Sequence, residues 1–274
     1  MLSRLPILTR ALARALARAL AFGGLAAAAL FAAVPAQAQA DDEPFARFED
    51  PICPGVVGLR RDAAEIMVSR IRANVEELGL RLAPDGDCKA NLLVAVLADG
   101  GDFLTEMRRN NAWLFAEMSR QESRALMAEP GPARAFLRVR TRSRDGIPVP
   151  RRENLTDLSQ TTMWMAHSKI YTATRNDILS ALVLFDREAM AGLTVVQLAD
   201  YATMRSLTRT LPDVPELRQD SILALFEGVP VRPTELSAFD HAYLGGLYEG
   251  MPNLPATTRI ARLEAATGRD IFVE

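Results

Sequence analysis

Cysteine, histidine and the familiar catalytic motifs are scarce or missing in this sequence. The chain has 274 residues but only two cysteines and two histidines. Cys53, Cys88, His167 and His241 are too far apart to form the short ligand spacings of a zinc site. The sequence also has no G-x-S-x-G, no G-x-x-x-x-G-K-S/T and no G-x-G-x-x-G after an expected strand. These absences exclude the protein classes that such motifs define, and we expect no metal and no cofactor.

A concentrated basic surface is also absent. The full chain has 32 Lys and Arg against 34 Asp and Glu. Because four of the arginines lie in residues 1–40, the remaining 234 residues carry 28 basic and 34 acidic side chains, a formal net charge of −6. A chain of this charge is not expected to bind nucleic acid, because phosphate binding requires a dense basic face.

One run is rich in arginine. Every second residue from Arg138 to Arg144 is an arginine, and Val139 and Thr141 lie between them. Alternation with a period of two is typical of a strand that has one face in solvent. We therefore expect the arginines to form the solvated face of a strand, and the alternative is a site for an anionic ligand.

No apolar run is long enough to span a bilayer, but residues 1–40 have the pattern of a signal peptide. Residues 19–34 are rich in Ala, Leu and Phe and fall short of the ~20 apolar residues that a bilayer span needs. Ala38-Gln39-Ala40 matches the small-x-small cleavage pattern. The positive charges before the apolar stretch are Arg4, Arg10, Arg14 and Arg18. We expect cleavage after Ala40 and a periplasmic or secreted protein that no longer contacts the membrane.

The two cysteines predict one disulfide. Cys53 and Cys88 form an even pair without C-x-x-C spacing, and an exported protein matures in an oxidising compartment. Neither cysteine has a neighbouring histidine in the sequence that could activate it as a nucleophile. A Cys53–Cys88 bond is thus the expected state.

Residues 41–150 are expected to form an N-terminal α/β lobe. A short strand at 56–59, an amphipathic helix at 64–78 and a continuous apolar strand at 91–98 give a β-α-β order. In such a unit the helix crosses the sheet between two parallel strands. Further elements are expected at 103–107 and 120–127 (helices) and at 133–141 (a strand).

Residues 151–274 are expected to form a C-terminal lobe of strands followed by helices, so the fold class is mixed α/β (α+β). Strands are predicted at 163–173 and 178–185. Thr194 and Gln197 have the spacing of a capping box, which predicts that a helix begins at Thr194 and ends before Pro212. Other helices are predicted at 220–226, 237–248 and 257–267.

Three stretches of the C-terminal lobe, 192–207, 220–226 and 236–248, carry a family resemblance. They resemble uncharacterised exported alphaproteobacterial proteins and, more distantly, zincin-like metallopeptidase-related families. In those families a strand precedes a helix that bears H-E-x-x-H. The resemblance implies a zincin-like scaffold, and the alternative is a generic strand-loop-helix.

The helix at 194–212 lacks the ligands of that motif. When the two are overlaid, Ala199 and Thr203 stand at the histidine positions, Asp200 at the glutamate and Ser206 at the glycine. Alanine cannot bind zinc and threonine is a poor ligand. The resemblance therefore implies a pseudoenzyme in which the metal-binding motif is lost.

We expect an exported, non-catalytic scaffold or binding protein for an unknown protein or small-molecule ligand. The residues best suited to such a binding site are Tyr201, Arg205 and Asp220. The alternative is a periplasmic hydrolase of unrecognised type, whose candidate catalytic residues are Asp200, His241 and His167.

The signal peptide leads to a direct test. Because Ala38-Gln39-Ala40 precedes Asp41, the mature protein should begin at Asp41. Intact mass spectrometry of protein isolated from the cell envelope measures this directly. A chain that keeps Met1 in the membrane fraction would show that residues 1–40 are an anchor.

Overall fold

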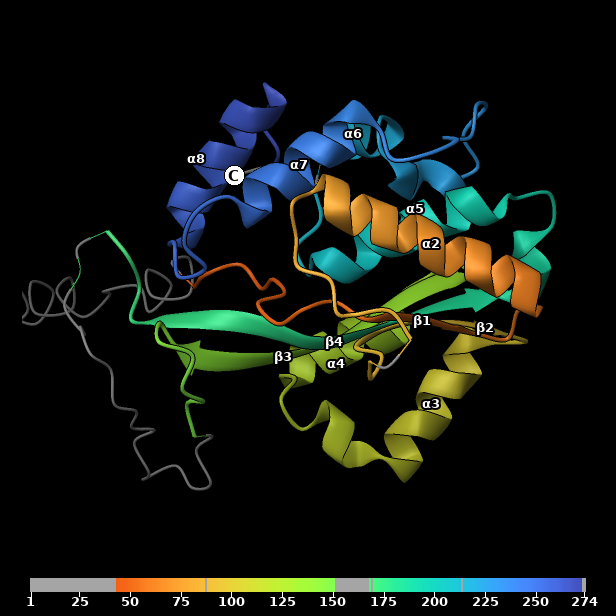
Figure 1. The fold of residues 1–274 in the computed structure, drawn as a ribbon, viewed down its shortest axis with the longest axis horizontal. Coiled ribbons are helices and arrows are strands. Elements are labelled where there is room, and N and C mark those ends of the chain that lie inside the picture. The colour runs from red at the N-terminus through yellow and green to blue at the C-terminus, as the bar shows by residue number, and fades with distance from the viewer. Residues whose placement is uncertain (1–42, 87, 151–167, 169, 213, 273–274) are drawn as a thin grey trace, which may run out of the picture. The chain divides into compact units, whose positions relative to one another are not determined.

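The mixed α/β fold expected from the sequence is confirmed in the computed structural model, which describes residues 43–86, 88–150, 168, 170–212 and 214–272 (Figure 1). The strands of this part of the chain are β1 (Pro54–Val57), β2 (Leu92–Leu97), β3 (Ala133–Ser143) and β4 (Thr174–Asp186). Its α-helices are α2 (Arg61–Glu77), α3 (Gly100–Asn110), α4 (Arg120–Ala128), α5 (Val195–Leu207), α6 (Pro215–Gln219), α7 (Ala238–Tyr248) and α8 (Ala256–Thr267). Short 3-10 helices are η2 (Ala112–Phe115), η3 (Arg187–Met190) and η4 (Ile222–Phe226).

The four strands form one mixed sheet in the order β1-β2-β4-β3. β1, β2 and β4 are parallel, and β3 pairs antiparallel with β4. The β1-α2-β2 unit expected from the sequence is thus present. Since β4 comes after residue 150 and the other strands come before it, the sheet combines strands from both parts of the chain.

Helices cover both faces of the sheet. α2, α5 and α7 lie on one face, and α3 and α4 lie on the other (Figure 1). The larger core includes Met67, Val183 and Leu198, and the smaller one includes Leu104 and Leu184. Val183 and Leu184 are neighbours in β4 that point to opposite faces, as the period of a strand requires. β4 is therefore buried on both sides.

β1 ends earlier than its apolar sequence predicts. The strand stops at Val57, and Gly58 has φ of 83°. A Cβ atom on Gly58 would lie 2.1 Å from the carbonyl oxygen of Val96. Only glycine combines this positive φ with so close an approach, so the chain turns at Gly58 toward α2.

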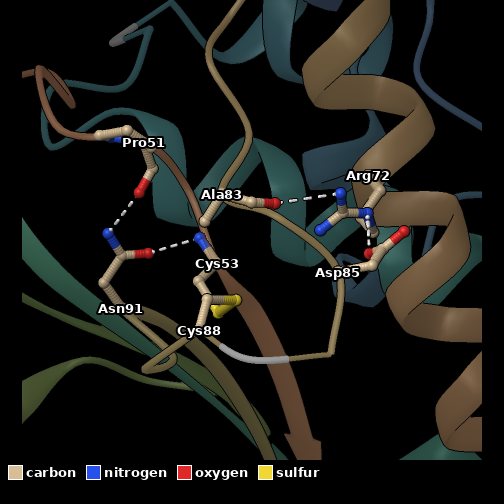
Figure 2. The surroundings of a disulfide bond; sticks show 7 residues. All are labelled: Pro51, Cys53, Arg72, Ala83, Asp85, Cys88 and Asn91. Atoms are coloured by element: carbon tan, nitrogen blue, oxygen red, sulfur yellow. Dashed lines mark hydrogen bonds and ion pairs between the residues drawn. A yellow bond between two sulfur atoms is a disulfide. The ribbon is translucent and has the colours of Figure 1, made fainter.

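The disulfide predicted between Cys53 and Cys88 is present and ties the start of β1 to the loop that enters β2 (Figure 2). The Asn91 side chain closes the same corner, because its Oδ1 accepts from the Cys53 amide at 2.8 Å and its Nδ2 donates to the Pro51 carbonyl at 3.0 Å. Arg72 holds the loop from α2 through Asp85, with 2.9 Å between Nε and Oδ1.

The segment before β1 is more buried than its polar sequence indicates. Phe48 and Ile52 are buried. The Arg47 amide donates to the Asn176 carbonyl at 3.2 Å, and the Ile178 amide donates to the Arg47 carbonyl at 2.9 Å, so this segment pairs with β4. The Arg47 guanidinium donates to the carbonyls of Tyr248 and Gly250 at the end of α7, each at 3.0 Å.

Three boundaries in the C-terminal lobe differ from the sequence expectation. Most of the strand predicted at 163–173 lies outside the described residues, and β4 begins at Thr174. α5 ends at Leu207 rather than close to Pro212, because Thr208 is already extended. The helix predicted at 220–226 is a 3-10 helix whose N-cap is Ser221.

Reduction of the disulfide should destabilise the fold. The bond closes a loop with a sequence separation of 35, and loss of this constraint costs roughly 3–4 kcal/mol in the chain-entropy model. For a domain of this size that corresponds to a fall in melting temperature of about 6–15 °C. Thermal melts with and without reductant measure the change, and peptide mapping that finds two free thiols in native protein would contradict it.

Candidate functional site

Two cavities lie side by side along the outer edge of β3, and we call them together the edge groove. Their volumes are about 430 and 420 Å³. Both are lined by Glu129, Pro130 and Arg205, so they meet at these residues. The first is bounded by α4, β3 and the end of α5, and its apolar lining includes Leu126 and Leu137.

An ion pair separates the two halves of the edge groove. Arg205 of α5 pairs with Glu129, which directly follows α4. The Arg205 guanidinium also donates to the Tyr201 hydroxyl at 3.2 Å. Tyr201 itself is a core residue, with its ring 5.0 Å from that of Phe226 and 5.8 Å from that of Phe185, measured between centroids. The Arg205 guanidinium is therefore held by two acceptors, the Tyr201 hydroxyl and the Glu129 carboxylate.

Burial shifts the pKa values of these groups. Burial raises the pKa of Tyr201, although the charge of Arg205 opposes this, so the phenol stays protonated. Burial acts to lower the pKa of Arg205, but the nearby Tyr201 and Glu129 raise it above its ordinary value. Arg205 is thus a permanent cation with two fixed acceptors.

A second pair extends the groove toward the end of α5. Arg209 pairs with Glu122 of α4, and both residues line the first cavity. Arg209 lies beyond the end of α5, in the segment that follows Leu207. Arg218 and Glu227, which line the second cavity, also pair, at 3.5 Å, so the charged side chains of the groove neutralise one another.

Local sequence explains why α5 presents Arg205 to the groove. The capping box expected at Thr194 is present: the Gln197 amide donates to the Thr194 hydroxyl at 3.1 Å, and the Thr194 amide donates to the Gln197 side chain at 2.9 Å. This cap fixes where the helix begins. The rotation of α5 follows, because its apolar residues Leu198 and Ala202 must face the core.

Asp200 lies away from the groove and is fully engaged. Its side chain is completely buried and accepts two hydrogen bonds from Arg70, both at 2.7 Å. It also accepts from Asn74 Nδ2 at 2.7 Å and from the Leu236 amide at 2.9 Å. Asp200 therefore joins α2, α5 and the loop before α7. Asp200 and Arg205 have separate partners, as their five-residue spacing predicts.

The helix positions equated with zinc ligands are also in the core. Ala199 and Thr203 are both fully buried. The Thr203 hydroxyl donates to the Ala199 carbonyl at 2.9 Å and accepts from Asn74 of α2 at 3.1 Å. These residues pack between α5 and α2, whereas Tyr201 and Arg205 are the α5 residues that line the groove.

The remaining candidates are dispersed. His241 lies in the first turn of α7, with its Nδ1 3.9 Å from a Glu77 carboxylate oxygen. Asp220 forms an exposed ion pair with Arg269. His167 is outside the described residues. Asp240, which precedes His241, is fully buried, caps α7 through Ser237 and accepts a hydrogen bond from Ser221.

The arginines of β3 differ from the solvated face that their alternation predicts. Arg138 lies 5.4 Å from the ring centroid of Trp113, and Arg140 pairs with Glu117 at 2.5 Å. Arg142 lies 3.4 Å from the buried Asp177. Burial raises the pKa of Asp177, against the effect of the neighbouring arginines. The run is thus half-buried and paired with local groups.

Of the three residues expected to bind a ligand, Tyr201 and Arg205 line the edge groove and Asp220 does not. Glu129, Glu122 and Arg209 also line it, and no local pattern in the sequence pointed to them. No group of three or more His, Cys, Asp or Glu side chains in the described residues could hold a metal ion. Among the same residues, no helix has the length and apolar character needed to cross a membrane.

Comparison of this chain with models of protein families, with curated proteins and with solved structures found no match.

The buried Asp200 pair leads to a stability prediction. Asp200→Asn removes the buried carboxylate and leaves Arg70, which is partly exposed, only its weaker contact with Glu235 at 3.5 Å. Removing one member of a buried pair costs about 3–5 kcal/mol, and we expect the low end of this range because Arg70 is partly solvated. Asp220→Asn is the matched control, because its pair with Arg269 is exposed and contributes little. Urea unfolding of both variants measures the difference. Equal stability of the two variants would contradict the structural role of Asp200.

Proposed function

We propose that this chain is an exported, non-catalytic binding protein whose ligand lies in the edge groove. The supporting observation is the pair of cavities, of about 430 and 420 Å³, that meet at Arg205 and Glu129. Ligand sites are typically concave, mostly apolar and ~300–1,000 Å³ in volume, with a few fixed polar groups. The first cavity of the edge groove has this composition, whereas the lining of the second is about equally polar and apolar.

A non-catalytic role is supported by how the polar groups are used. Catalysis requires a nucleophile or base within hydrogen-bond reach of a reacting group. In the groove, Arg205 and Glu129 neutralise each other, and Tyr201 retains its proton. The alternative hydrolase would draw on Asp200, His241 or His167. Asp200 is enclosed by four hydrogen bonds on the α2 side of α5, which favours the binding role.

Export is the second part of the proposal. The Cys53–Cys88 disulfide fits an extracellular or periplasmic location, because cytosolic thiols are kept reduced. The charge and cleavage pattern of residues 1–40 adds to this argument. The zincin-like ancestry belongs to the same proposal, as a scaffold in which Ala199 and Thr203 have become core residues.

Site-specific photo-crosslinking tests the location of the binding site. Ala125 is exposed and lines the first cavity, whereas Ala265 is an exposed alanine on α8. Benzoylphenylalanine at position 125, but not at 265, should form an adduct in the cells that produce the protein, and the intact mass of the adduct gives the size of the ligand. Ala128→Trp, which narrows the same cavity, should remove the adduct. Equal adducts at both positions, or none at 125, would contradict the proposal.

A further inference from the structure

β3 is the outermost strand of the described sheet, so apart from a short pairing with residues 147–149 its outer edge has no neighbouring strand among the described residues. In an antiparallel ladder, alternate residues direct their N–H and C=O groups toward the partner strand and away from it. The Asp186 amide donates to the Pro132 carbonyl at 2.8 Å, at the point where β3 begins. Even-numbered residues of β3 therefore bond to β4, and odd-numbered residues face outward.

A second observation gives the same alternation at the other end of β3. The Val149 amide donates to the Thr141 carbonyl at 3.2 Å, and the Ser143 amide donates to the Ile147 carbonyl at 2.8 Å. Arg138 pairs with Ser180 and Val139 pairs with Ile178, so Leu179 is an extra residue in β4 at this irregularity. The alternation of inward and outward backbone groups along β3 therefore continues unchanged. Residues 147–149 thus occupy the outer edge beside Thr141 and Ser143.

Among the described residues, the outward backbone groups of Ala133, Ala135 and Leu137 have no such cover. These three residues line the edge groove. Among the described residues, no backbone or side-chain hydrogen bond from outside the sheet reaches the backbone of Ala135 or Leu137. Unpaired groups on an edge strand are a template for another extended chain. The groove therefore offers a ladder of donors and acceptors next to an apolar wall.

We propose that the edge groove binds an extended polypeptide segment, which adds to β3 as a further strand opposite Ala135 and Leu137, on the first-cavity side of the Arg205–Glu129 ion pair. This proposal rests on the proposed binding function and names its ligand. Main-chain hydrogen bonds to an exposed edge supply affinity in this mode, and pockets for alternate side chains supply specificity. The small side chains of Ala133 and Ala135 leave room beside the strand.

The lining predicts which peptide side chains fit. Met118, Leu126 and Leu211 surround the first cavity, so alternate residues of the peptide should be apolar. The charges nearby are already balanced, because Arg205 pairs with Glu129 and Arg209 with Glu122. A strongly charged peptide therefore gains no affinity from these groups. The favoured partner is a peptide with apolar side chains at alternate positions.

The test uses nonapeptides selected from a random phage library on the immobilised protein and then synthesised with blocked ends. Peptides that add to β3 direct alternate amides toward it. Two series of each peptide are therefore N-methylated, one at the odd positions and one at the even positions. N-methylation should weaken binding at least tenfold in one series and less than threefold in the other. Fluorescence polarisation measures both series on the wild-type protein. Equal effects of the two series, or no selected peptide that binds in solution, would overturn strand addition.

Variants of the protein locate the contact. Ala135→Pro removes one outward amide and no bond to β4, a position where an edge strand tolerates proline, and should weaken binding at least tenfold. Ala135→Ser keeps the amide and should bind within threefold of wild type. If Ala135→Pro does not fold, the N-methyl series still decides the question. Wild-type affinity in a folded Ala135→Pro variant would contradict the proposal.

A groove-filling variant separates this proposal from the proposed function. Ala128→Trp, which fills the first cavity, should abolish binding of the selected peptides. If it does so while both N-methyl series bind equally, the groove is a binding site but the peptide does not add as a strand. If Ala128→Trp binds the peptides as wild type does, both proposals fail.

Discussion

The pairing of β4 with both of its neighbours is the constraint on which the other features of the structure depend. β4 forms parallel bonds with β2 on one side and antiparallel bonds with β3 on the other. Val183 and Leu184 are fully buried on opposite faces of the strand. A strand that is apolar on both faces must be covered by helices on both faces. The two helical layers are therefore a consequence of the composition of β4.

The edge groove follows from the same arrangement. In the described sheet β3 has only β4 as a neighbour, so it is the outer strand. α5, which follows β4 in the chain, returns across one face of the sheet to end near it. α4 approaches β3 from the opposite layer (Figure 1). Arg205 of α5 meets Glu129 at the end of α4 where the two layers come together. The edge groove thus lies where the two helical layers meet at the edge of the sheet.

Much of the fold could be predicted because its signals are local. Thr194 and Ser237 cap their helices as their spacing indicates, and Leu92–Leu97 is a buried strand as its unbroken apolar run indicates. The disulfide followed from the cysteine count. In each case the physical cause lies within a few residues of the element, or in the chemistry of one residue type.

The candidate site was only partly predictable, because its partners are distant in sequence. The separation of Arg205 from Glu129 is 76 residues, and that of Asp200 from Arg70 is 130. No local pattern distinguishes a paired arginine from a solvated one, which is also why the arginines of β3 were expected in solvent. The free edge of β3 depends on strand order, a property that appears only once the sheet is assembled.

The position of Arg47 has a consequence for how the chain acquires its fold during synthesis. Its side chain binds the carbonyls of Tyr248 and Gly250, about 200 residues further along the chain, and its backbone pairs with β4. A ribosome that adds ~5–20 residues per second releases Arg47 roughly 10–40 seconds before those carbonyls. For roughly the first two-thirds of that interval the segment has neither of its partners, and until the end it lacks the carbonyls that bind the Arg47 side chain. Final closure of the structure must therefore wait until almost the entire polypeptide is available.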